Sequence, residues 1–481
     1  MGSTVRFILD GEVVELDDVD PTRTVLQYLR EDLRRKGSKE GCAEGDCGAC
    51  TVVVAEKVAA KDSVNLRAIN SCIQFLPTLH GKELITVESL QPKGSALHPV
   101  QQAMVDQHGS QCGFCTPGFV MSLFALYESN DSPGRTEIDD ALAGNLCRCT
   151  GYRPIVAAAK AMYQMPAAKA PVVHTDKLDA LDASDTLSID NGQRKFFAPV
   201  SSSELATLLA AHPDATILAG GTDVGLWVTK QHRVLDTVIY TGRVNELATV
   251  VESESHIEIG AAVTLTDAMQ VIVEHYPHLD ELFRRFASPP IRNAGTLGGN
   301  IANGSPIGDS MAALMVAGCE LVLQSTAGTR ETSLEDFYID YQVKDLRPGE
   351  FLASIRLPKL ADGVILRSHK LSKRFDQDIS AVCTAYRLEL ADGKVTDFAM
   401  ACGGLAATIK RASNCEAALL GAQWNESSIA KAQAALADDF SPISDMRASA
   451  EYRLQATQNL LRRFYLESIG EFEQTVYNYG R

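Results

Sequence analysis

Hydrophobic and polar residues in the first 85 positions alternate in short runs, a pattern that predicts strands. The segment VRFILDGEVVEL has an apolar run on each side of Asp10-Gly11, a dipeptide typical of a tight β-hairpin. From Thr24 to Arg35 the apolar residues recur at helical spacing, and the run TVVV from position 51 predicts a further strand. Residues 1–85 are therefore predicted to form a small β-grasp unit.

Residues 86–164 have a different periodicity, which predicts helices. LHPVQQAMVDQHG has helical apolar spacing and ends at Gly109. Thr116 and Pro117 are residue types that favour the start of a helix, and the apolar segment GFVMSLFALYES follows them. Pro154 stands in the same way near the start of IVAAAKAM. This segment is therefore predicted to be a helical domain.

The rest of the chain divides into a linker and two mixed segments. Residues 165–192 are rich in Ala, Asp, Ser and Pro and have weak periodicity, as expected of a linker. Residues 193–372 carry two glycine-rich stretches that each follow an apolar one. Residues 373–481 begin with alternating strands and end in amphipathic helices. The whole chain is therefore predicted to be an α+β protein of several domains.

Eight of the twelve cysteines lie in the first 150 residues, in two sets of four. The first set reads C-x4-C-x2-C with a fourth cysteine downstream, which is the plant-type ferredoxin spacing for a [2Fe–2S] cluster. Glycines stand between these cysteines and allow the backbone to bend tightly and turn N–H groups toward an anionic cluster. A structural zinc site is the alternative, although zinc sites usually pair one C-x2-C with another. The first set is Cys42, Cys47, Cys50 and Cys72.

The second set consists of a C-x2-C pair and a C-x-C pair, each followed by a predicted helix. The positive N-terminal ends of both helices would point toward the cysteines, as an anionic [2Fe–2S] cluster requires. This spacing also departs from the common zinc patterns. The second set is Cys112, Cys115, Cys147 and Cys149. The other four cysteines lie in apolar contexts without ligand spacing, which predicts buried structural thiols.

The glycine-rich stretches TILAGGTDVGLW and NAGTLGGNIANGSPIGDS predict a phosphate-binding role. Neither contains G-x-G-x-x-G, so no Rossmann fingerprint is present. Each nevertheless gathers bare backbone N–H groups in one place, which suits a pyrophosphate. Ordinary tight turns are the alternative interpretation.

Charge and hydropathy limit the kinds of partner that this protein is expected to bind. A net charge of −16 argues against nucleic acid as a partner. No apolar run approaches the roughly 18 residues of a membrane span, and the N-terminus lacks the features of a signal peptide. In a chain of this length, many cysteines indicate reduced metal ligands rather than a disulfide scaffold. We therefore expect a cytoplasmic protein that binds neither membrane nor nucleic acid.

The blocks GCAEGDCGACTV, SQCGFCTPGF and GNLCRCTGYRPI resemble, in order and spacing, the iron–sulfur part of the molybdenum hydroxylases, the xanthine dehydrogenase and xanthine oxidase family. The resemblance implies that the first cysteine set holds a distal cluster, nearest the flavin. The second set would hold a proximal cluster, nearest the molybdopterin. Gln111 matches the glutamine that contacts the pterin, with an ordinary loop amide as the alternative.

The later segments resemble the FAD domain of the same family and the C-terminal domain of its flavoproteins, with boundaries 193–372 and 373–481. The resemblance implies a PCMH-type fold, like that of vanillyl-alcohol oxidase. The first pyrophosphate loop would be Ile217, Leu218, Ala219, Gly220, Gly221, Thr222, Asp223 and Val224. The second would be Thr296, Leu297, Gly298, Gly299 and Asn300. The remaining FAD contacts would be Phe286 beside the isoalloxazine, Asp309, Leu352 and Lys370. The first loop reads G-G-T-D where the family often has G-N-T-E.

Relatives continue into a large molybdenum-binding region, whereas this sequence ends at Arg481. The resemblance therefore implies the small subunit of a bacterial two-gene enzyme whose large subunit binds the molybdenum cofactor and oxidises xanthine or hypoxanthine. Electrons would pass through two [2Fe–2S] clusters to FAD and then to NAD+, in purine catabolism. An (αβ)2 heterotetramer is the expected assembly.

Three alternatives stay open on the sequence. One is a molybdenum hydroxylase for an aldehyde or an N-heterocycle. The second is an electron-transfer module with flavin and clusters but no molybdenum partner, against which the proximal motif and Gln111 argue. The third is a non-enzymatic redox sensor, for which the sequence offers no DNA-binding helix or basic patch.

Overall fold

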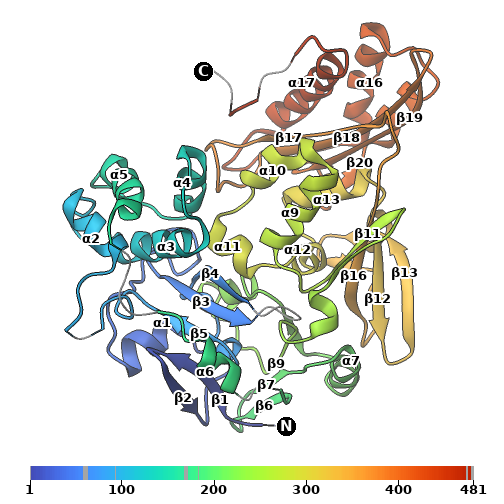
Figure 1. Cartoon of the computed structure of the whole chain (residues 1–481). Helices are drawn as coiled ribbons and strands as arrows, with labels where there is room; N and C mark the ends of the chain where they lie inside the picture. Colours follow the sequence, from blue (N-terminus) through green and yellow to red (C-terminus); the bar gives the residue numbers. More distant parts are fainter. Residues whose placement is uncertain are drawn as a thin grey trace. The chain divides into compact units, whose positions relative to one another are not determined.

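The computed structural model describes residues 2–57, 63–92, 94–166, 172–181, 184–472 and 475–477. The chain forms two compact units (Figure 1). The first unit consists of Met1–Glu246 together with Ser288–Thr296. The second consists of Leu247–Ala287 and Leu297–Arg481. The segment predicted to bind FAD therefore contributes residues to both units.

The N-terminal sheet of the first unit has the strand order β2-β1-β5-β3-β4. Its first two strands form the predicted hairpin, and Asp10 and Gly11 both have positive φ, 54° and 73°, as a two-residue turn of this type requires. β1 runs parallel to β5, whereas β3 is antiparallel to both of its neighbours. The strands are β1 (Val5–Leu9), β2 (Glu12–Leu16), β3 (Thr51–Lys57), β4 (Val64–Asn70) and β5 (Glu83–Ile85).

The helix predicted from Thr24 to Arg35 is shorter in the structure. Thr24 caps α1 (Val25–Gln27), because its Oγ1 accepts a hydrogen bond from the Gln27 N–H at 3.1 Å. A π-type turn, Tyr28–Asp32, follows directly. The wider turn rotates Leu33 away from the apolar face, so that it is 38% exposed rather than buried.

Four helices follow, and the longest of them, α3, packs on β3 and β4 (Figure 1). Phe119 and Phe124 of α3 are fully buried in a core that also contains Val53 of β3. The ferredoxin-like sheet and the helical domain therefore share one hydrophobic core. The helices are α2 (Pro99–Asp106), α3 (Thr116–Ser129), α4 (Arg135–Leu142) and α5 (Arg153–Ala161).

His98 caps α2 and is buried in this core, which makes the helical domain sensitive to acid. Its Nδ1 accepts a hydrogen bond from the Val100 N–H at 3.3 Å, and its Nε2 lies 4.0 Å from the Glu128 carboxylate without a hydrogen bond. Burial lowers the pKa of His98 to about 4, below its ordinary value of 6.5. The folded protein therefore keeps this imidazole neutral.

We predict that this histidine makes the protein less stable as the pH falls. Because the pKa of His98 is lower in the folded protein, its contribution to stability is complete above pH 6.5. This contribution is lost as the pH falls toward 4. Proton linkage predicts that the free energy of unfolding falls by about 2 kcal/mol between about pH 7 and pH 5. Urea unfolding at several pH values should show this slope, and H98N, which keeps a capping acceptor, should flatten it. Equal slopes for both proteins would contradict the prediction.

A second sheet of the first unit has the order β6-β7-β9-β8, in which β7, β9 and β8 run parallel. The segment expected to be a linker contains a helix, α6, and the strand β6. His174, just before α6, is tied to the ferredoxin-like sheet by a 2.6 Å contact between its Nδ1 and Oε1 of the buried Glu83. The elements are α6 (Thr175–Ala180), β6 (Leu187–Asp190), β7 (Lys195–Ala198), α7 (Ser202–Ala211), β8 (Thr216–Leu218), α8 (Val224–Thr229), β9 (Thr237–Tyr240) and α11 (Pro289–Ala294).

The second unit has two main sheets. The first has the order β10-β11-β16-β12-β13 and is antiparallel throughout. Its elements are β10 (Val250–Glu252), β11 (His256–Gly260), α9 (Leu265–His275), α10 (Asp280–Arg284), α12 (Leu297–Asn303), α13 (Asp309–Val316), β12 (Glu320–Ser325), β13 (Gly328–Ser333), α14 (Leu334–Phe337), the hairpin β14 (Tyr338–Asp340) and β15 (Val343–Lys344), and β16 (Phe351–Pro358).

The last sheet has the order β17-β18-β19-β20, and α17 packs on β18 and β17. This arrangement confirms the alternating strands and terminal helices expected after position 373. The elements are β17 (Ile365–Leu371), β18 (Val382–Ala391), β19 (Lys394–Gly403), β20 (Lys410–Arg411), α15 (Ser413–Leu419), α16 (Glu426–Asp439) and α17 (Ala450–Ser468).

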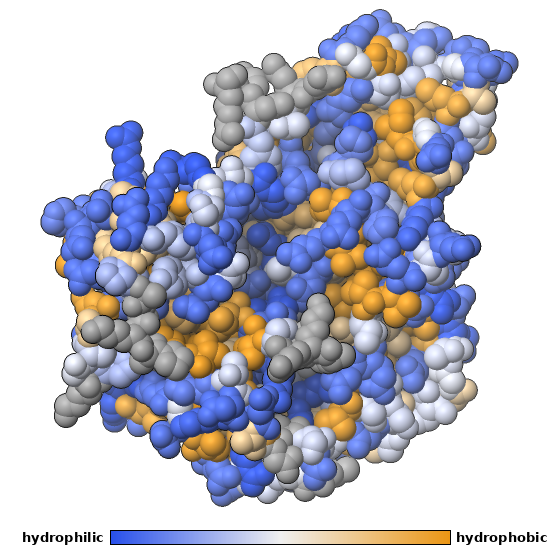
Figure 2. Space-filling view, viewed as in Figure 1, coloured by the Kyte–Doolittle hydropathy of each residue, from blue (hydrophilic) through white to orange (hydrophobic). Residues whose placement is uncertain are grey.

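The α+β multidomain class predicted from the sequence is confirmed. Among the described residues, no helix combines the length and apolar character that a bilayer crossing requires. The face drawn in Figure 2 is mostly hydrophilic, and its hydrophobic residues lie in separate patches.

Candidate cluster and flavin sites

The first cysteine set lies in the loop before β3 and in the turn after β4, and the structure brings its thiols together. Cys50 and Cys72 are buried, with their Sγ atoms 3.3 Å apart. The backbone N–H groups of Asp46 and Cys47 both donate to Cys42 Sγ at 3.3 Å. Positive φ angles at Gly45 and Gly48, 79° and 69°, bend the loop so that these N–H groups face the sulfur. The role that the sequence predicts for these glycines therefore matches the geometry.

The thiols of this set form two pairs, each with one more acidic member. A hydrogen bond from the Cys47 thiol lowers the pKa of Cys42 to about 5, while the pKa of Cys47 is raised by the same contact. In the other pair, the contact between the two sulfur atoms lowers the pKa of Cys50 and raises that of Cys72. In each pair one thiol therefore has the lower pKa, and the thiolate is the form of cysteine that binds metal.

The second set lies between α2 and α3 and directly before α5. Cys112 and Cys149 are exposed and within hydrogen-bonding reach of each other, and Cys115 pairs with Cys147 in the same way. Backbone hydrogen bonding at Phe114, together with the Cys149 thiol, lowers the pKa of Cys112.

Both helices begin beside this second set, as predicted. α3 starts at Thr116 with Cys115 as its N-cap residue, one position earlier than the predicted cap, and α5 starts at Arg153. The Cys147 N–H donates to the Tyr152 hydroxyl at 3.0 Å, so the residue before α5 holds the loop in place.

In both sets the thiols lie in two pairs. A [2Fe–2S] cluster is held by four thiolates, two on each iron, so its ligands form two pairs. The observed pairs are Cys42 with Cys47, Cys50 with Cys72, Cys112 with Cys149 and Cys115 with Cys147. The residues therefore fit two [2Fe–2S] clusters.

Gln111 is exposed beside Cys112. Three large apolar side chains of these loops are also exposed, Phe114 at 46%, Leu146 at 41% and Tyr152 at 40%. This end of the first unit therefore presents two thiols, an amide and two aromatic rings to its surroundings. The pterin contact expected of Gln111 stays a prediction.

The first predicted FAD loop lies in the first unit, between β8 and α8. Ile217 and Leu218 belong to β8, Ala219–Asp223 form the turn, and Val224 begins α8. A Cβ at Gly220 would lie 1.9 Å from the carbonyl oxygen of Ala294, so only glycine permits this approach. Gly221 has a φ of +74°, a second constraint on the same turn.

This loop and α8 pack directly on the first cysteine set. A Cβ at Gly225 would lie 2.4 Å from the carbonyl oxygen of Ile73, the residue after Cys72. The Thr229 hydroxyl donates to the Ala43 carbonyl at 2.8 Å, next to Cys42. Side chains from the flavin segment, Leu226 and Ile291, complete a small apolar cluster around Cys50 and Cys72. The sequence does not reveal this contact, because the partners are about 150 residues or more apart in the chain.

The second predicted FAD loop is largely helical. Thr296 is the last residue of the first unit, whereas Leu297, Gly298, Gly299 and Asn300 form the first turn of α12 in the second. A Cβ at Gly298 would lie 2.5 Å from that of Ala261, so this glycine is required for packing. Asn300 Oδ1 accepts a hydrogen bond from Ser310 at 2.7 Å.

The remaining predicted FAD contacts lie in the second unit, and two of them meet. Lys370 Nζ donates to Asp309 Oδ2 at 2.5 Å, and both side chains are almost fully buried. Ser380, which sequence reasoning missed, donates to Asp309 Oδ1 at 2.5 Å. Leu352 is buried in β16 and Phe286 packs against the same core. The FAD contacts of all these residues stay predictions.

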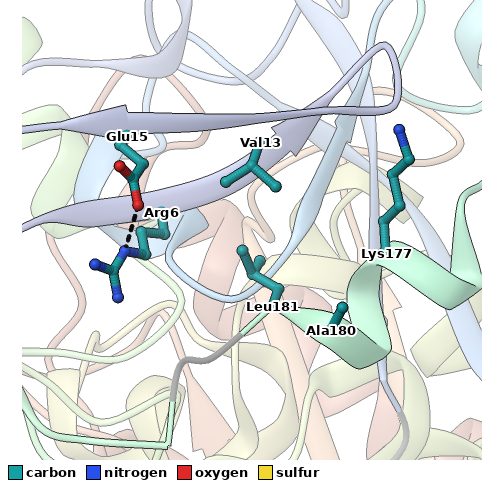
Figure 3. Close-up of a pocket in the computed structure, with 6 residues that line it drawn as sticks. All are labelled: Arg6, Val13, Glu15, Lys177, Ala180 and Leu181. Atoms are coloured by element: carbon teal, nitrogen blue, oxygen red, sulfur yellow. Dashed lines mark hydrogen bonds and ion pairs between the residues drawn. The ribbon is translucent and has the colours of Figure 1, made fainter.

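A pocket of about 280 Å³ lies between β1, β2 and α6, and none of its lining residues is a predicted ligand (Figure 3). Arg6 and Glu15 form a 2.8 Å ion pair on its wall. It has no glycine-rich backbone that could receive a pyrophosphate. Its lining residues are Arg6, Val13, Glu15, Lys177, Ala180 and Leu181.

Cys319, Cys383, Cys402 and Cys415 are buried, as their apolar contexts predict. Burial raises the pKa of each.

Four family models match the chain in sequence. They are the 2Fe-2S iron-sulfur cluster binding domain over residues 7–73, the [2Fe-2S] binding domain over 86–160, the FAD binding domain in molybdopterin dehydrogenase over 191–360, and the CO dehydrogenase flavoprotein C-terminal domain over 367–468. These are the domains that the resemblance to the xanthine oxidase family predicts. The iron–sulfur, FAD and flavoprotein domains expected from the sequence are therefore confirmed.

Curated relatives match nearly the whole chain but are much longer. A xanthine dehydrogenase of Emericella nidulans is 32% identical, over 98% of this chain and 39% of its own length. Aldehyde oxidase 1 of Bos taurus is 30% identical, over 97% of this chain and 39% of its own length. The chain thus spans about two fifths of these relatives.

Solved structures match more than half of the chain. A chain of carbon monoxide dehydrogenase from Hydrogenophaga pseudoflava is 29% identical with a TM-score of 0.53, over 56% of this chain and 94% of that one. A chain of quinoline 2-oxidoreductase from Pseudomonas putida 86 is 25% identical with a TM-score of 0.53, over 57% and 97%.

Proposed function

We propose that this chain is the iron–sulfur and FAD subunit of a xanthine dehydrogenase. In this proposal a separate large subunit binds the molybdenum cofactor and oxidises xanthine or hypoxanthine in the cytoplasm, and an (αβ)2 assembly forms. This chain carries the electrons to NAD+. The observation that supports it best is the continuous chain of contacts in the first unit, from the exposed cysteine pair to the first FAD loop.

The contacts along this route support a direction of electron flow. The exposed end, with Cys112, Cys149 and Gln111, is accessible to a partner subunit. The other end, with Cys50 and Cys72, is covered by Leu226 and Ile291 of the flavin segment. When bound, iron–sulfur clusters carry single electrons and the flavin collects two for hydride transfer. The chain's own residues bind these groups and exclude water from the inner set.

The first test is the metal content of the anaerobically purified chain. We expect about four iron and four acid-labile sulfide per chain, because each thiol set holds one [2Fe–2S] cluster. C47S and C149S should each lose about half of the iron, whereas C319A should keep all of it. About two iron in the unchanged protein, or zinc in place of iron, would contradict the assignment.

A second candidate is the corresponding subunit of a molybdenum hydroxylase for an aldehyde or an N-heterocycle. The similarity to aldehyde oxidase 1 and to quinoline 2-oxidoreductase favours it. The two candidates are distinguished by adding xanthine, an aldehyde or quinoline to the complex and recording which of them bleaches the visible absorbance of the flavin and clusters. Under the first proposal only purines should bleach it at low concentration.

A further inference from the structure

The loops that carry the two predicted ligand sets touch each other inside the first unit. The N–H of Leu146 donates to the carbonyl oxygen of Cys47 at 3.0 Å. Cys47 belongs to the first set, and Leu146 directly precedes Cys147 of the second. One hydrogen bond and one peptide unit therefore connect a ligand of one set to a ligand of the other.

Asn145 fixes this contact from the neighbouring position. Its side chain is 3% exposed, and its Nδ2 donates to the Gly48 carbonyl at 3.1 Å and to Thr51 Oγ1 at 3.3 Å. On the other side, its Oδ1 accepts a hydrogen bond from Ser122 Oγ at 2.7 Å. The amide is therefore held on both sides, in a site from which water is excluded. A buried network of this kind resists rearrangement because a broken bond leaves an unpaired polar group.

Glycines allow the two backbones to approach this closely. A Cβ at Gly48 would lie 2.1 Å from the Gly144 carbonyl oxygen, and a Cβ at Gly118 would lie 2.1 Å from the Gly48 carbonyl oxygen. No side chain larger than hydrogen fits at either position. The loops are therefore joined by direct backbone contact at Cys47 and Gly48.

The Phe114 ring also lies near the first set. The point that a Cβ at Gly41 would occupy lies 2.8 Å from Cys47 Sγ and 3.5 Å from Phe114 Cε1. The ring and the sulfur thus flank the same point. Phe114 is, however, 46% exposed, whereas the Asn145 network is buried. The buried Asn145 network therefore has the better-defined geometry.

We infer that electrons cross between the two ligand sets through the hydrogen bond from Leu146 to Cys47, and that Asn145 is the residue that positions this crossing. The inference rests on the proposed function, because both sets must hold their clusters. One electron leaves the Cys147 side, which is oxidised, and arrives on the Cys47 side, which is reduced. No covalent bond is made or broken and no proton is transferred.

The test compares N145A with the unchanged full-length chain, both anaerobic and fully loaded. Two quantities are measured: the magnetic splitting between the two reduced clusters in low-temperature EPR spectra, and the rate at which an electron redistributes between them after a reducing pulse. We expect N145A to show a smaller splitting and a several-fold slower redistribution, with iron content and direct flavin reduction by NADH unchanged. S122A, which leaves both bonds donated by Asn145 in place, should have a smaller effect.

F114L tests the alternative route through the Phe114 ring. This variant should leave the magnetic splitting and the rate of electron redistribution unchanged. A slower redistribution in F114L together with an unchanged N145A would overturn the inference. N145D is nearly isosteric but places an oxygen opposite the Gly48 carbonyl, so it should behave like N145A. It replaces N145A in the measurement if N145A lacks iron. Loss of iron in both Asn145 variants would also contradict the inference, since Asn145 would then be needed for cluster assembly rather than for the crossing. Absence of iron from the unchanged chain would instead refute the proposed function.

Discussion

Replacing Cys112 with serine is expected to abolish xanthine-dependent NAD+ reduction in the enzyme assembled with its molybdenum subunit, while NADH oxidation with an artificial dye continues. Cys112 is one of the exposed thiols of the proximal set, and its contact with Cys149 forms one of the two pairs that a [2Fe–2S] cluster needs. Loss of that pair interrupts electron entry from the partner. The inner cysteine set and the flavin segment lie beyond the interruption, so NADH should still reduce the flavin directly.

The measurement is a pair of rates from the same preparation, xanthine to NAD+ and NADH to dye. C149S should repeat the result, because it removes the other member of the pair. C319A is the matched control: this thiol is buried in the second unit outside both sets, and both rates should survive. Loss of the two rates together in C112S, at full FAD content, would show that the proximal set is needed for more than electron entry.

Replacing Gly220 with alanine is expected to remove FAD while both clusters remain. The added methyl group would lie 1.9 Å from the Ala294 carbonyl oxygen and 2.4 Å from its carbon, and these are backbone atoms that cannot rotate away. The turn between β8 and α8 must then move, and the backbone groups predicted to receive the pyrophosphate move with it.

Flavin absorbance and iron content of G220A separate the two cofactor sites. G2A is the matched control, because a Cβ there has no heavy atom within 4 Å. G221A tests the same turn by another mechanism. A Cβ at Gly221 has room, because the nearest atom lies 3.6 Å away, but the φ of +74° costs an L-residue about 1–2 kcal/mol. We therefore expect a weaker loss of FAD in G221A. Full FAD occupancy in G220A would be incompatible with the predicted loop.

The features that the sequence predicted well are those in which nearby residues determine the geometry. The hairpin at Asp10-Gly11 and the helix starts after Cys115 and before Pro154 follow from local turn and capping chemistry. The first cysteine set consists of short spacings plus one distant partner, and the second consists of two close pairs. In the structure the thiols of each set lie together.

Features that depend on distant contacts or on small energetic differences could not be predicted. The bonds of Asn145 reach across more than 90 residues to Gly48 and Thr51, and Asn145 itself looks like an ordinary loop amide in the sequence. The helical spacing from Thr24 to Arg35 does not show the π-type turn after α1, which leaves Leu33 38% exposed. Likewise, glycines in TLGGN suggested a loop, whereas packing on Ala261 makes them part of α12.

The most direct test of the proposed electron relay is anaerobic reduction of the purified complex and of this chain alone, followed by flavin absorbance and cluster EPR. In the complex that the chain forms with its molybdenum subunit, xanthine should reduce both clusters and the flavin, and NAD+ should reoxidise them. In the chain alone, xanthine should reduce nothing, whereas NADH should reduce the flavin and then the clusters. Reduction of the isolated chain by xanthine, or a complex whose clusters and flavin stay oxidised with every purine while NADH reduces them, would contradict the account.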